Sequence, residues 1–332
     1  MSFSVKSWNY LIKISLVVLF GVVIWWQLFH KNQFSEIWAE FQTHLKNGHL
    51  FLLILMIVLM PANWLLETAK WRLLLPEHSN LSFRTCLKAV VGGITLSLLT
   101  PNRIGEYGGR MLFVPRNIQW STVIATLAGS FSQNLINIGF GCIGLFSVFL
   151  WRDHLGMDSL GWWYLALFIG LGAMLYMYFR MGLIYHWIQR FKLPLFFERG
   201  KKYLKLLTTY SRARLSKALA IALLRYLVFS LQFVLILHFF GLEVPFIWTF
   251  WGVTIIYLFQ TGIPLPPFVD IMARSELALI LWQNYAPNEL SVMSASFSIW
   301  MINLVIPAIT GLIAIENINV LKSIGYVQNE KP

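Results

Sequence analysis

Residues 50–69 read LFLLILMIVLMPANWLLETA, and this stretch decides the fold class. About 20 residues of α-helix span the hydrocarbon core of a bilayer, and this stretch carries a single charged residue, Glu67. A carboxylate so far into an apolar run is energetically costly unless it is paired or faces water. The stretch therefore predicts a transmembrane helix whose charge points into the interior of a helix bundle.

The rest of the chain shares this apolar character. Of its 332 residues 58% are hydrophobic and 12% are charged, and the mean hydropathy is +0.65. Soluble domains carry about 25% charged residues. The two cysteines, Cys86 and Cys142, lie in different apolar stretches, which argues against a disulfide framework or a thiolate metal site. We expect an all-α, polytopic protein of the cell inner membrane, with no metal or cofactor.

Apolar stretches long enough to suggest membrane spans recur along the chain. The first is not a signal peptide, because it ends in Trp25-Trp26-Gln27 without a small-residue cleavage pattern. A further apolar piece, 275–284, is too short to cross. We expect about eight spans, at 10–29, 50–69, 86–100, 121–150, 161–180, 218–240, 246–263 and 291–315.

The distribution of lysine and arginine predicts the orientation. The connection from Arg180 to Lys217 carries ten Lys and Arg residues against Glu198 alone, and ten minus one leaves +9. Cytoplasmic loops carry such an excess, so this connection and the N-terminus are expected in the cytoplasm. Successive loops must lie on alternate sides of the membrane. With the basic segments in the cytoplasm, 86–100 and 275–284 cannot both be full crossings. We expect two broken or re-entrant helices there.

The chain offers no room for an independent soluble domain. We expect one flippase-like transmembrane domain over 1–332, with possible halves 1–180 and 218–320 joined by the basic loop 181–217. Residues 200–214 of that loop are expected to form an interfacial helix, which either binds anionic lipid or only sets the topology. The net charge of +12 then reflects the membrane surface and not a nucleic-acid partner.

The strongest local signal is the break LTPNRIGEYGGR at 99–110. Proline and glycines interrupt a helix, and non-helical backbone at membrane depth persists only beside protein or a water-filled cavity. Arg103 and Arg110 are suited to hold a phosphate, because the planar guanidinium donates two parallel hydrogen bonds. Glu106 can balance their charge or accept from an amine. The alternative is an ordinary cytoplasmic turn with an arginine and glutamate pair.

Two other helical stretches carry polar faces. Asn63, Glu67 and Lys70 fall on one stripe of the second span, where Glu67 and Lys70 can pair, and the following Trp71 and Arg72 are expected at the membrane interface. The span 121–150 carries a second polar face, which either lines the same cavity or joins helices together. Its members are Thr126, Ser130, Gln133, Asn134 and Asn137.

Two ionisable residues of the span 218–240 receive simpler interpretations. Arg225 lies one to two turns from the start of the span, so we expect its side chain to reach back to the cytoplasmic interface. His238 has no second histidine or carboxylate at ligand spacing, which argues against a metal role.

A second break, GIPLPPFVD at 262–270, precedes Arg274 and Glu276. It repeats the order of the first break, with proline followed by an arginine and a glutamate. The two breaks lie on either side of the basic loop. Interrupted segments at corresponding positions of two halves are typical of a transporter's substrate site.

Three motifs resemble those of a known family. They are NWLLETAKWR at 63–72, TPNRIGE at 100–106 and the proline break before Arg274 and Glu276. The chain resembles, from about residue 10 to 320, the transmembrane region of the lysylphosphatidylglycerol synthases, which are flippase-like proteins. Many members have Pro-x-Gly-Gly at the second break, where this chain has Pro266-Pro267-Phe268-Val269-Asp270.

The resemblance implies a function. In the best-known members this membrane domain flips an aminoacylated phospholipid that a separate cytosolic transferase domain produces. Because the chain ends at Pro332 without such a domain, we expect only the flippase part, with a separate lipid-modifying enzyme as a possible partner.

Two functional hypotheses follow. In the leading one, the chain translocates an anionic phospholipid or a polyprenyl-phosphate headgroup without any covalent step. In the alternative, it is a membrane-embedded transferase for a lipid-linked sugar or aminoacyl group, although no acidic pair at metal-binding spacing, Gly-x-Ser-x-Gly elbow or Rossmann glycine pattern is found. The predicted substrate-binding residues are Glu67, Lys70, Arg103, Glu106, Arg110, Asn134, Arg274 and Glu276.

Overall fold

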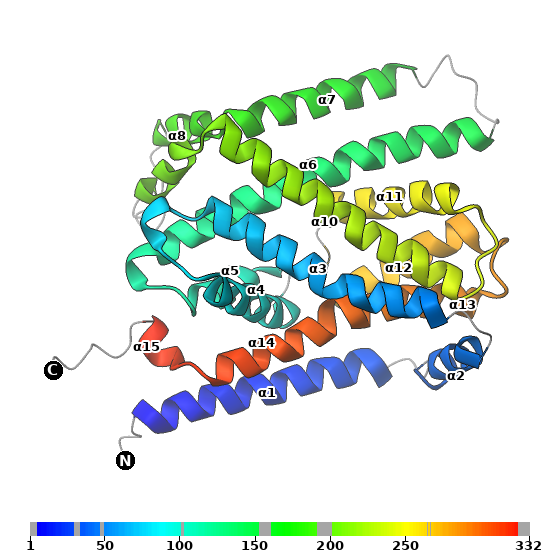
Figure 1. Cartoon of the computed structure of the whole chain (residues 1–332), viewed down its shortest axis with the longest axis horizontal. Helices are drawn as coiled ribbons and strands as arrows, with labels where there is room; N and C mark the ends of the chain where they lie inside the picture. Colours follow the sequence, from blue (N-terminus) through cyan, green and yellow to red (C-terminus); the bar gives the residue numbers. More distant parts are fainter. Residues whose placement is uncertain are drawn as a thin grey trace.

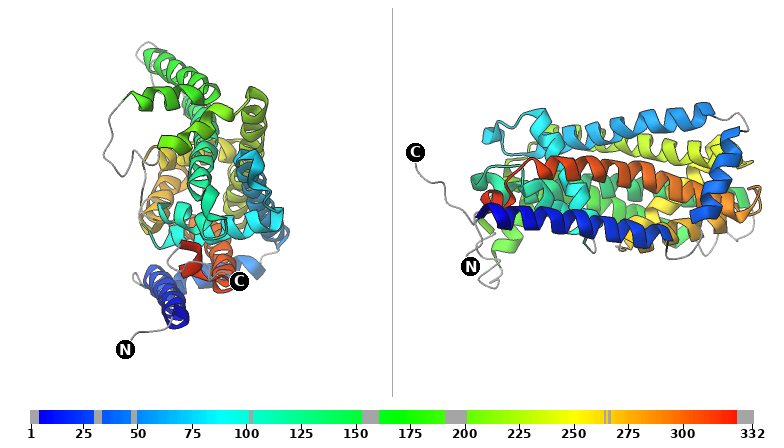
Figure 2. Two further views of the ribbon diagram at one scale, coloured as in Figure 1. Left: turned by 90° about the vertical axis from the view of Figure 1, so that its left-hand side faces the viewer. Right: turned by 90° about the horizontal axis from the view of Figure 1, so that it is seen from below.

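The structure, a computed structural model, describes residues 5–29, 34–46, 50–100, 103–152, 161–190, 201–263, 265 and 267–324. Every regular element in these ranges is helical, as the sequence predicts. The longer helices run along the long axis of the molecule (Figures 1 and 2). They are α1 (Val5–Phe29), α3 (Leu50–Leu74), α6 (Gln119–Arg152), α7 (Gly161–Phe179), α10 (Arg212–Phe239) and α13 (Glu289–Trp300) with α14 (Ile306–Glu316).

Several helices have the length and composition of a membrane span. Three of the described helices qualify, namely α3, α10 and the continuous Glu289–Glu316, and a fourth is present if the bent pair Leu165–Phe179 and Met181–Gln189 forms one span. Two shorter apolar helices cover Trp8–Val22 and Phe246–Gly262. The all-α membrane class is therefore confirmed, while the number of about eight crossings stays a prediction.

The antiparallel helices α3 and α10 lie side by side on the face of the bundle that is nearest the viewer in Figure 1 (Figures 1 and 2). Small residues of α10, Ala218 and Ala222, are fully buried, and such residues let helix backbones approach closely. The same packing buries the polar stripe of α3, in which Asn63, Glu67 and Lys70 are 3%, 7% and 1% exposed. The stripe thus faces the bundle interior, as its position in an apolar run predicts.

The first break forms an antiparallel helical hairpin, here called the first hairpin, from α4 (Phe83–Leu98) and α5 (Gly105–Met111). Its two helices touch through glycine: a Cβ on Gly109 would lie 2.5 Å from the carbonyl oxygen of Gly92. The amide of Gly105 donates to Thr100 Oγ1 at 2.7 Å, which closes the turn. Arg103 sits at the tip with a φ of 56°. The expected break at 86–100 therefore follows Leu98.

The second break forms a corresponding pair, the second hairpin, from α11 (Phe246–Gly262) and α12 (Pro267–Trp282). Gln260 Nε2 donates to Asp270 Oδ1 at 2.6 Å near the tip, and the Glu243 amide donates to the Tyr285 carbonyl at 2.9 Å at the open end. Pro264 and Pro266 lie outside the described residues. The segment 275–284, expected to be broken or re-entrant, lies within α12, which runs continuously to Trp282 as the second helix of this hairpin.

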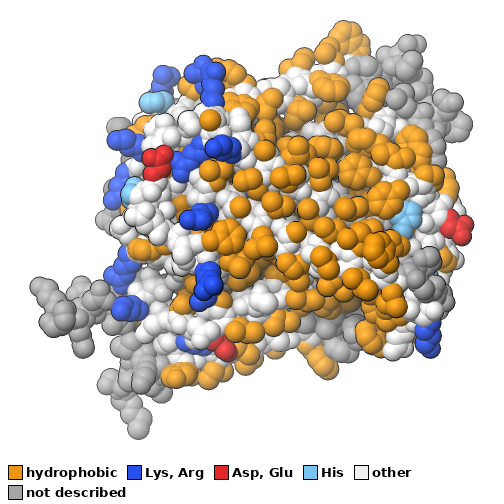
Figure 3. Space-filling model, viewed as in Figure 1, with side chains coloured by type: hydrophobic (Ala, Val, Ile, Leu, Met, Phe, Trp, Pro, Cys, Tyr) orange, Lys and Arg blue, Asp and Glu red, His pale blue; other side chains and the backbone are white. Residues whose placement is uncertain are grey.

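The two hairpins enter the bundle from opposite ends. The first hairpin opens at the end where α3 ends and α10 begins, and the second opens at the end where α10 terminates (Figures 1 and 2). We call the former the basic end, because the Lys and Arg side chains visible on one face gather there, beside a middle covered by hydrophobic side chains (Figure 3). A separate short helix, α2 (Phe34–Lys46), lies at the other end.

The helix expected over 200–214 is formed in part. Residues 201–204 are α-helical, a 3₁₀ segment continues over Lys205–Thr209, and α10 begins at Arg212 after the N-cap Ser211. Tyr210 Oη donates to the Leu74 carbonyl at 2.7 Å, so the helical segment 201–209 is followed by a contact with the C-terminus of α3. Its position at the membrane surface stays a prediction.

Candidate functional site

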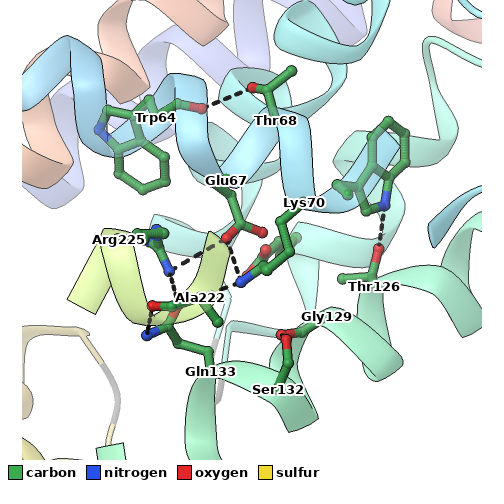
Figure 4. Close-up of polar contacts among 12 residues, drawn as sticks. Trp64, Glu67, Thr68, Lys70, Thr126, Gly129, Ser132, Gln133, Ala222 and Arg225 are labelled. Carbon is green, nitrogen blue, oxygen red and sulfur yellow. Dashed lines mark hydrogen bonds and ion pairs between the residues drawn. The ribbon is translucent and has the colours of Figure 1, made fainter. Parts of the chain in front are cut away.

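Glu67 is the centre of a group of buried charges drawn from three helices. Its carboxylate lies 2.8 Å from Lys70 Nζ, 3.0 Å from Arg110 Nη2 and 3.3 Å from Arg225 Nη1. Lys70 lies one turn further along α3, Arg110 comes from α5 and Arg225 from α10. The predicted pair of Glu67 and Lys70 is therefore present, within a larger set of contacts (Figure 4).

Glu106 joins this group from the first hairpin. Its carboxylate accepts from Arg110 Nη2, four residues along α5. The small size of Gly93 makes room for the pair, because a Cβ there would lie 3.0 Å from both Arg110 Cγ and the Glu106 carbonyl oxygen. The five residues Glu67, Lys70, Glu106, Arg110 and Arg225 are called the charge cluster below.

The charge cluster has an excess of positive charge. Three cations stand against two carboxylates, so three minus two leaves a formal +1. Arg110 is 1% exposed, yet its Nε and Nη1 have no hydrogen-bond partner among the described residues, and neither has Arg225 Nε. Buried donors of this kind are normally satisfied. The cluster thus has the charge and the free donors to receive an anion.

A chain of hydrogen bonds leads from the charge cluster to the second hairpin. Gln133 of α6 accepts at Oε1 from Arg225 Nη1 at 3.1 Å and from Lys70 Nζ at 3.4 Å (Figure 4). Its Nε2 donates to Asn137 Oδ1 at 3.3 Å, and Asn137 Nδ2 donates to Thr261 Oγ1 at 2.9 Å. We call Gln133, Asn137 and Thr261 the polar relay. It joins the two hairpins through α6.

The second hairpin carries a smaller polar group. Arg274 Nη2 lies 3.3 Å from Asp270 Oδ2, and its guanidinium lies 6.0 Å from the ring centre of Tyr257. Arg274 Nε has no hydrogen-bond partner among the described residues. The predicted neighbour Glu276 is exposed and is not part of this group. Helical spacing explains the difference, because Asp270 precedes Arg274 by four residues and Glu276 follows it by only two.

Arg225 does not reach the interface, contrary to the sequence-based expectation. Its guanidinium lies against Glu67 and Gln133 and stacks 5.4 Å from the ring centre of Trp64. It stays inside because α10 turns this position toward the carboxylate of α3. Trp71 was likewise expected at the interface, but it is fully buried and its Nε1 donates to Thr126 Oγ1 at 2.9 Å.

The other predicted substrate-binding residues are more peripheral. Arg103 is exposed at the tip of the first hairpin. Asn134 lies on the exposed side of α6, whereas its neighbours Gln133 and Ser132 are buried. Gln133 and Asn137, two members of the polar relay, are four residues apart and lie on one face of α6, whereas Asn134 is turned about 100° away from Gln133 around the helix.

A second layer of polar contacts lies further along α10. Gln232 Nε2 donates to the Met56 carbonyl at 2.8 Å and Gln232 Oε1 accepts from Asn303 Nδ2 at 3.0 Å. Asn303 lies in a π-helical turn, Met301–Val305, between α13 and α14. Such turns inside α-helices are frequent at functional sites. No group of three or more His, Cys, Asp or Glu side chains comes together in the described part of the chain.

Comparison with known proteins places this arrangement in a family. Residues 11–271 match the family model described as the lysylphosphatidylglycerol synthase TM region. No curated protein and no solved structure matches the chain significantly. The matched range contains α3, both hairpin tips, the polar relay and Arg225, and it covers well over half of the 332 residues. The chain is therefore a multi-pass membrane protein that belongs to the family of the lysylphosphatidylglycerol synthase transmembrane region.

Proposed function

We propose that the protein translocates a lipid with a phosphate-bearing headgroup between the two leaflets of the membrane. The observation that supports this most is the buried charge cluster, which has a formal charge of +1 and unpartnered guanidinium donors. An anionic phospholipid or a polyprenyl-phosphate lipid would supply the missing acceptors. Arginine suits this role because its fork matches phosphate oxygens.

The arrangement of the hairpins supports a path for such a headgroup. Their tips approach the middle of the bundle from opposite ends, and the polar relay joins the charge cluster of the first hairpin to Thr261 at the second (Figure 1). A headgroup that leaves Arg110 would find polar partners at Asn137 and then at Arg274. Interrupted helices that meet near the membrane midplane are the usual setting for transported substrates.

The geometry favours translocation over group transfer. A general base must be able to take a proton from its substrate, and both carboxylates of the charge cluster are already engaged. Glu67 contacts three cations and Glu106 contacts Arg110. The third candidate base, Glu276, is exposed and lies apart from the charge cluster. We further propose that the basic end faces the cytoplasm, since cytoplasmic segments carry the excess of Lys and Arg.

Reconstitution in liposomes tests the proposal. Purified full-length protein is inserted into vesicles containing a fluorescent phosphatidylglycerol, and translocation is followed by dithionite quenching of the outer leaflet. Arg110→Lys keeps the charge but loses the fork, so we expect translocation to fall about tenfold or more. Arg84→Lys, on an exposed residue outside the charge cluster, is the matched control and should translocate as wild type does.

Two outcomes would contradict the proposal. One is wild-type translocation no faster than in protein-free vesicles, with either fluorescent phosphatidylglycerol or a fluorescent polyprenyl phosphate. The other is an Arg110→Lys rate equal to that of wild type. Lipid extracts of a strain that lacks the protein test the alternative, because a missing lipid species there would support the transferase hypothesis instead.

A further inference from the structure

The outer face of α3 and α10 carries a groove at the basic end, separate from the charge cluster. The groove has a volume of about 930 Å³. Arg72 lies two residues after Lys70, which is about 200° around the helix, so the groove and the charge cluster occupy opposite sides of α3. The groove is lined from both helices and from the segment after α3, by residues that include Arg72, Leu73, Glu77, Arg214 and Lys217.

The groove is positively charged. Arg72, Arg214 and Lys217 stand against Glu77, and three minus one leaves +2. Arg214 is occupied: its Nε donates to the Leu73 carbonyl at 2.7 Å, and its Nη1 lies 3.4 Å from Glu77 Oε1. Arg72 and Lys217 are exposed, and neither forms an ion pair with another residue that the structure describes. Arg214 thus ties the two helices together, while the other two cations remain available.

An apolar strip continues from the groove toward the middle of the molecule. Leu65 lies seven residues before Arg72 on α3, and Leu224 lies seven residues after Lys217 on α10. Seven residues are about two helical turns, so each leucine lies on the same face as its cation. Because the helices are antiparallel, both leucines lie deeper in the apolar region. They are 44% and 54% exposed.

We propose that this groove binds one anionic phospholipid from the surrounding membrane. The lipid phosphate lies between Arg72 and Lys217, and its acyl chains extend over Leu65 and Leu224. The cations of the groove lie at the basic end, where the lipid headgroup would be, and the leucines lie toward the hydrophobic middle, beside the acyl chains (Figure 3). The surface therefore matches the order of charged and apolar parts in a phospholipid. The bound lipid would bridge α3 and α10 on the outside, next to the clamp formed by Arg214.

Native mass spectrometry of the full-length protein in detergent tests this site. The protein is titrated with dioleoyl phosphatidylglycerol and, separately, with dioleoyl phosphatidylcholine. We expect tighter binding of phosphatidylglycerol to wild type. Each cation near an anionic headgroup contributes roughly fivefold in affinity, so Arg72→Gln with Lys217→Gln should weaken phosphatidylglycerol binding by about twenty-five-fold.

The matched control is the double variant Arg84→Gln with Lys88→Gln. It removes the same two charges from exposed positions outside the groove, and it should bind phosphatidylglycerol as wild type does. A charge-preserving pair, Arg72→Lys with Lys217→Arg, should retain binding and shows that the groove tolerates substitution. The proposal is overturned if both neutralising pairs weaken binding equally, if the charge-preserving pair also loses it, or if wild type binds phosphatidylcholine as tightly.

Discussion

The two hairpins have the same outline but different polar content. In the first hairpin, Arg110 is buried and contacts two carboxylates, and the surrounding charge cluster has an excess positive charge. In the second, Asp270 is the only described residue with which Arg274 forms an ion pair, and the Asp270 side chain is 29% exposed. Under the proposed function, the first hairpin would bind the anionic headgroup. The second carries a balanced ion pair, which a headgroup would displace at a lower cost.

The hairpins also differ in how their helices touch. In the first, glycine meets backbone, since a Cβ on Gly109 would lie 2.5 Å from the Gly92 carbonyl oxygen. In the second, glycine meets a side chain, since a Cβ on Gly252 would lie 2.3 Å from Cζ2 of Trp282. An indole ring can rotate away from a new methyl group, whereas a helix backbone must move as a whole. The first hairpin is thus expected to tolerate an added methyl group less well than the second.

The largest difference in stability between changes at the two hairpins is expected when the carboxylate of Glu67 is removed. Glu67→Gln leaves three buried cations without their shared partner, and breaking a buried pair in this way costs about 3–5 kcal/mol. We expect this loss in the free energy of unfolding, measured by SDS denaturation of the protein in detergent micelles. Glu276→Gln, at an exposed carboxylate of the second hairpin, should stay close to wild type. Equal stability of the two variants would mean that the charge cluster is not formed.

Alanine substitutions at Gly109 and Gly252 test whether the two hairpins differ in their tolerance of an added methyl group. Overpacking costs about 1–3 kcal/mol, and we expect Gly109→Ala to lose more unfolding free energy than Gly252→Ala. Gly108→Ala is the control on the same helix, because nothing lies within 4 Å of a Cβ there and alanine favours helix. If Gly252→Ala were the more destabilised, the side chain of Trp282 would be the less movable neighbour.

The polar relay is tested by Asn137→Ala. This variant removes the contact with Thr261 Oγ1 at 2.9 Å, and a hydrogen bond of this kind contributes about 1 kcal/mol to the free energy of unfolding. Asn134→Ala, on the exposed side of the same helix, should have little effect. Combining Asn137→Ala with Thr261→Val in a double-mutant cycle measures the coupling, and additive losses would show that α6 does not link the hairpins.

The smallest effect is expected at the second hairpin. Asp270→Asn weakens a partly exposed ion pair, and such pairs contribute about 0–1 kcal/mol. In the same SDS denaturation, the free energy of unfolding of this variant should be within that range of the wild-type value. It should be well above that of Glu67→Gln. A loss as large as that of Glu67→Gln would show that the two hairpins carry equally important charges.

Part of this arrangement could be predicted from local spacing. Glu67 and Lys70 are three residues apart on one helix, and their pairing follows from the helical repeat. Both breaks were evident from their prolines. The contact between Arg110 and Glu67 was not evident, because it joins residues 43 positions apart. Arg225 was misplaced for the same reason, since its partner lies on another helix.

The amino-acid sequence alone was sufficient to predict the class of the protein and the positions of its breaks. An apolar chain with a few charges must fold as helices in a membrane, because every backbone polar group has to be satisfied within the chain there. Which charged residues contact one another was evident only from the folded structure. The ends from which the hairpins enter, and the close approach of α3, α5 and α10 around Glu67, depend on packing between distant segments. A single sequence carries no periodic signal for such contacts.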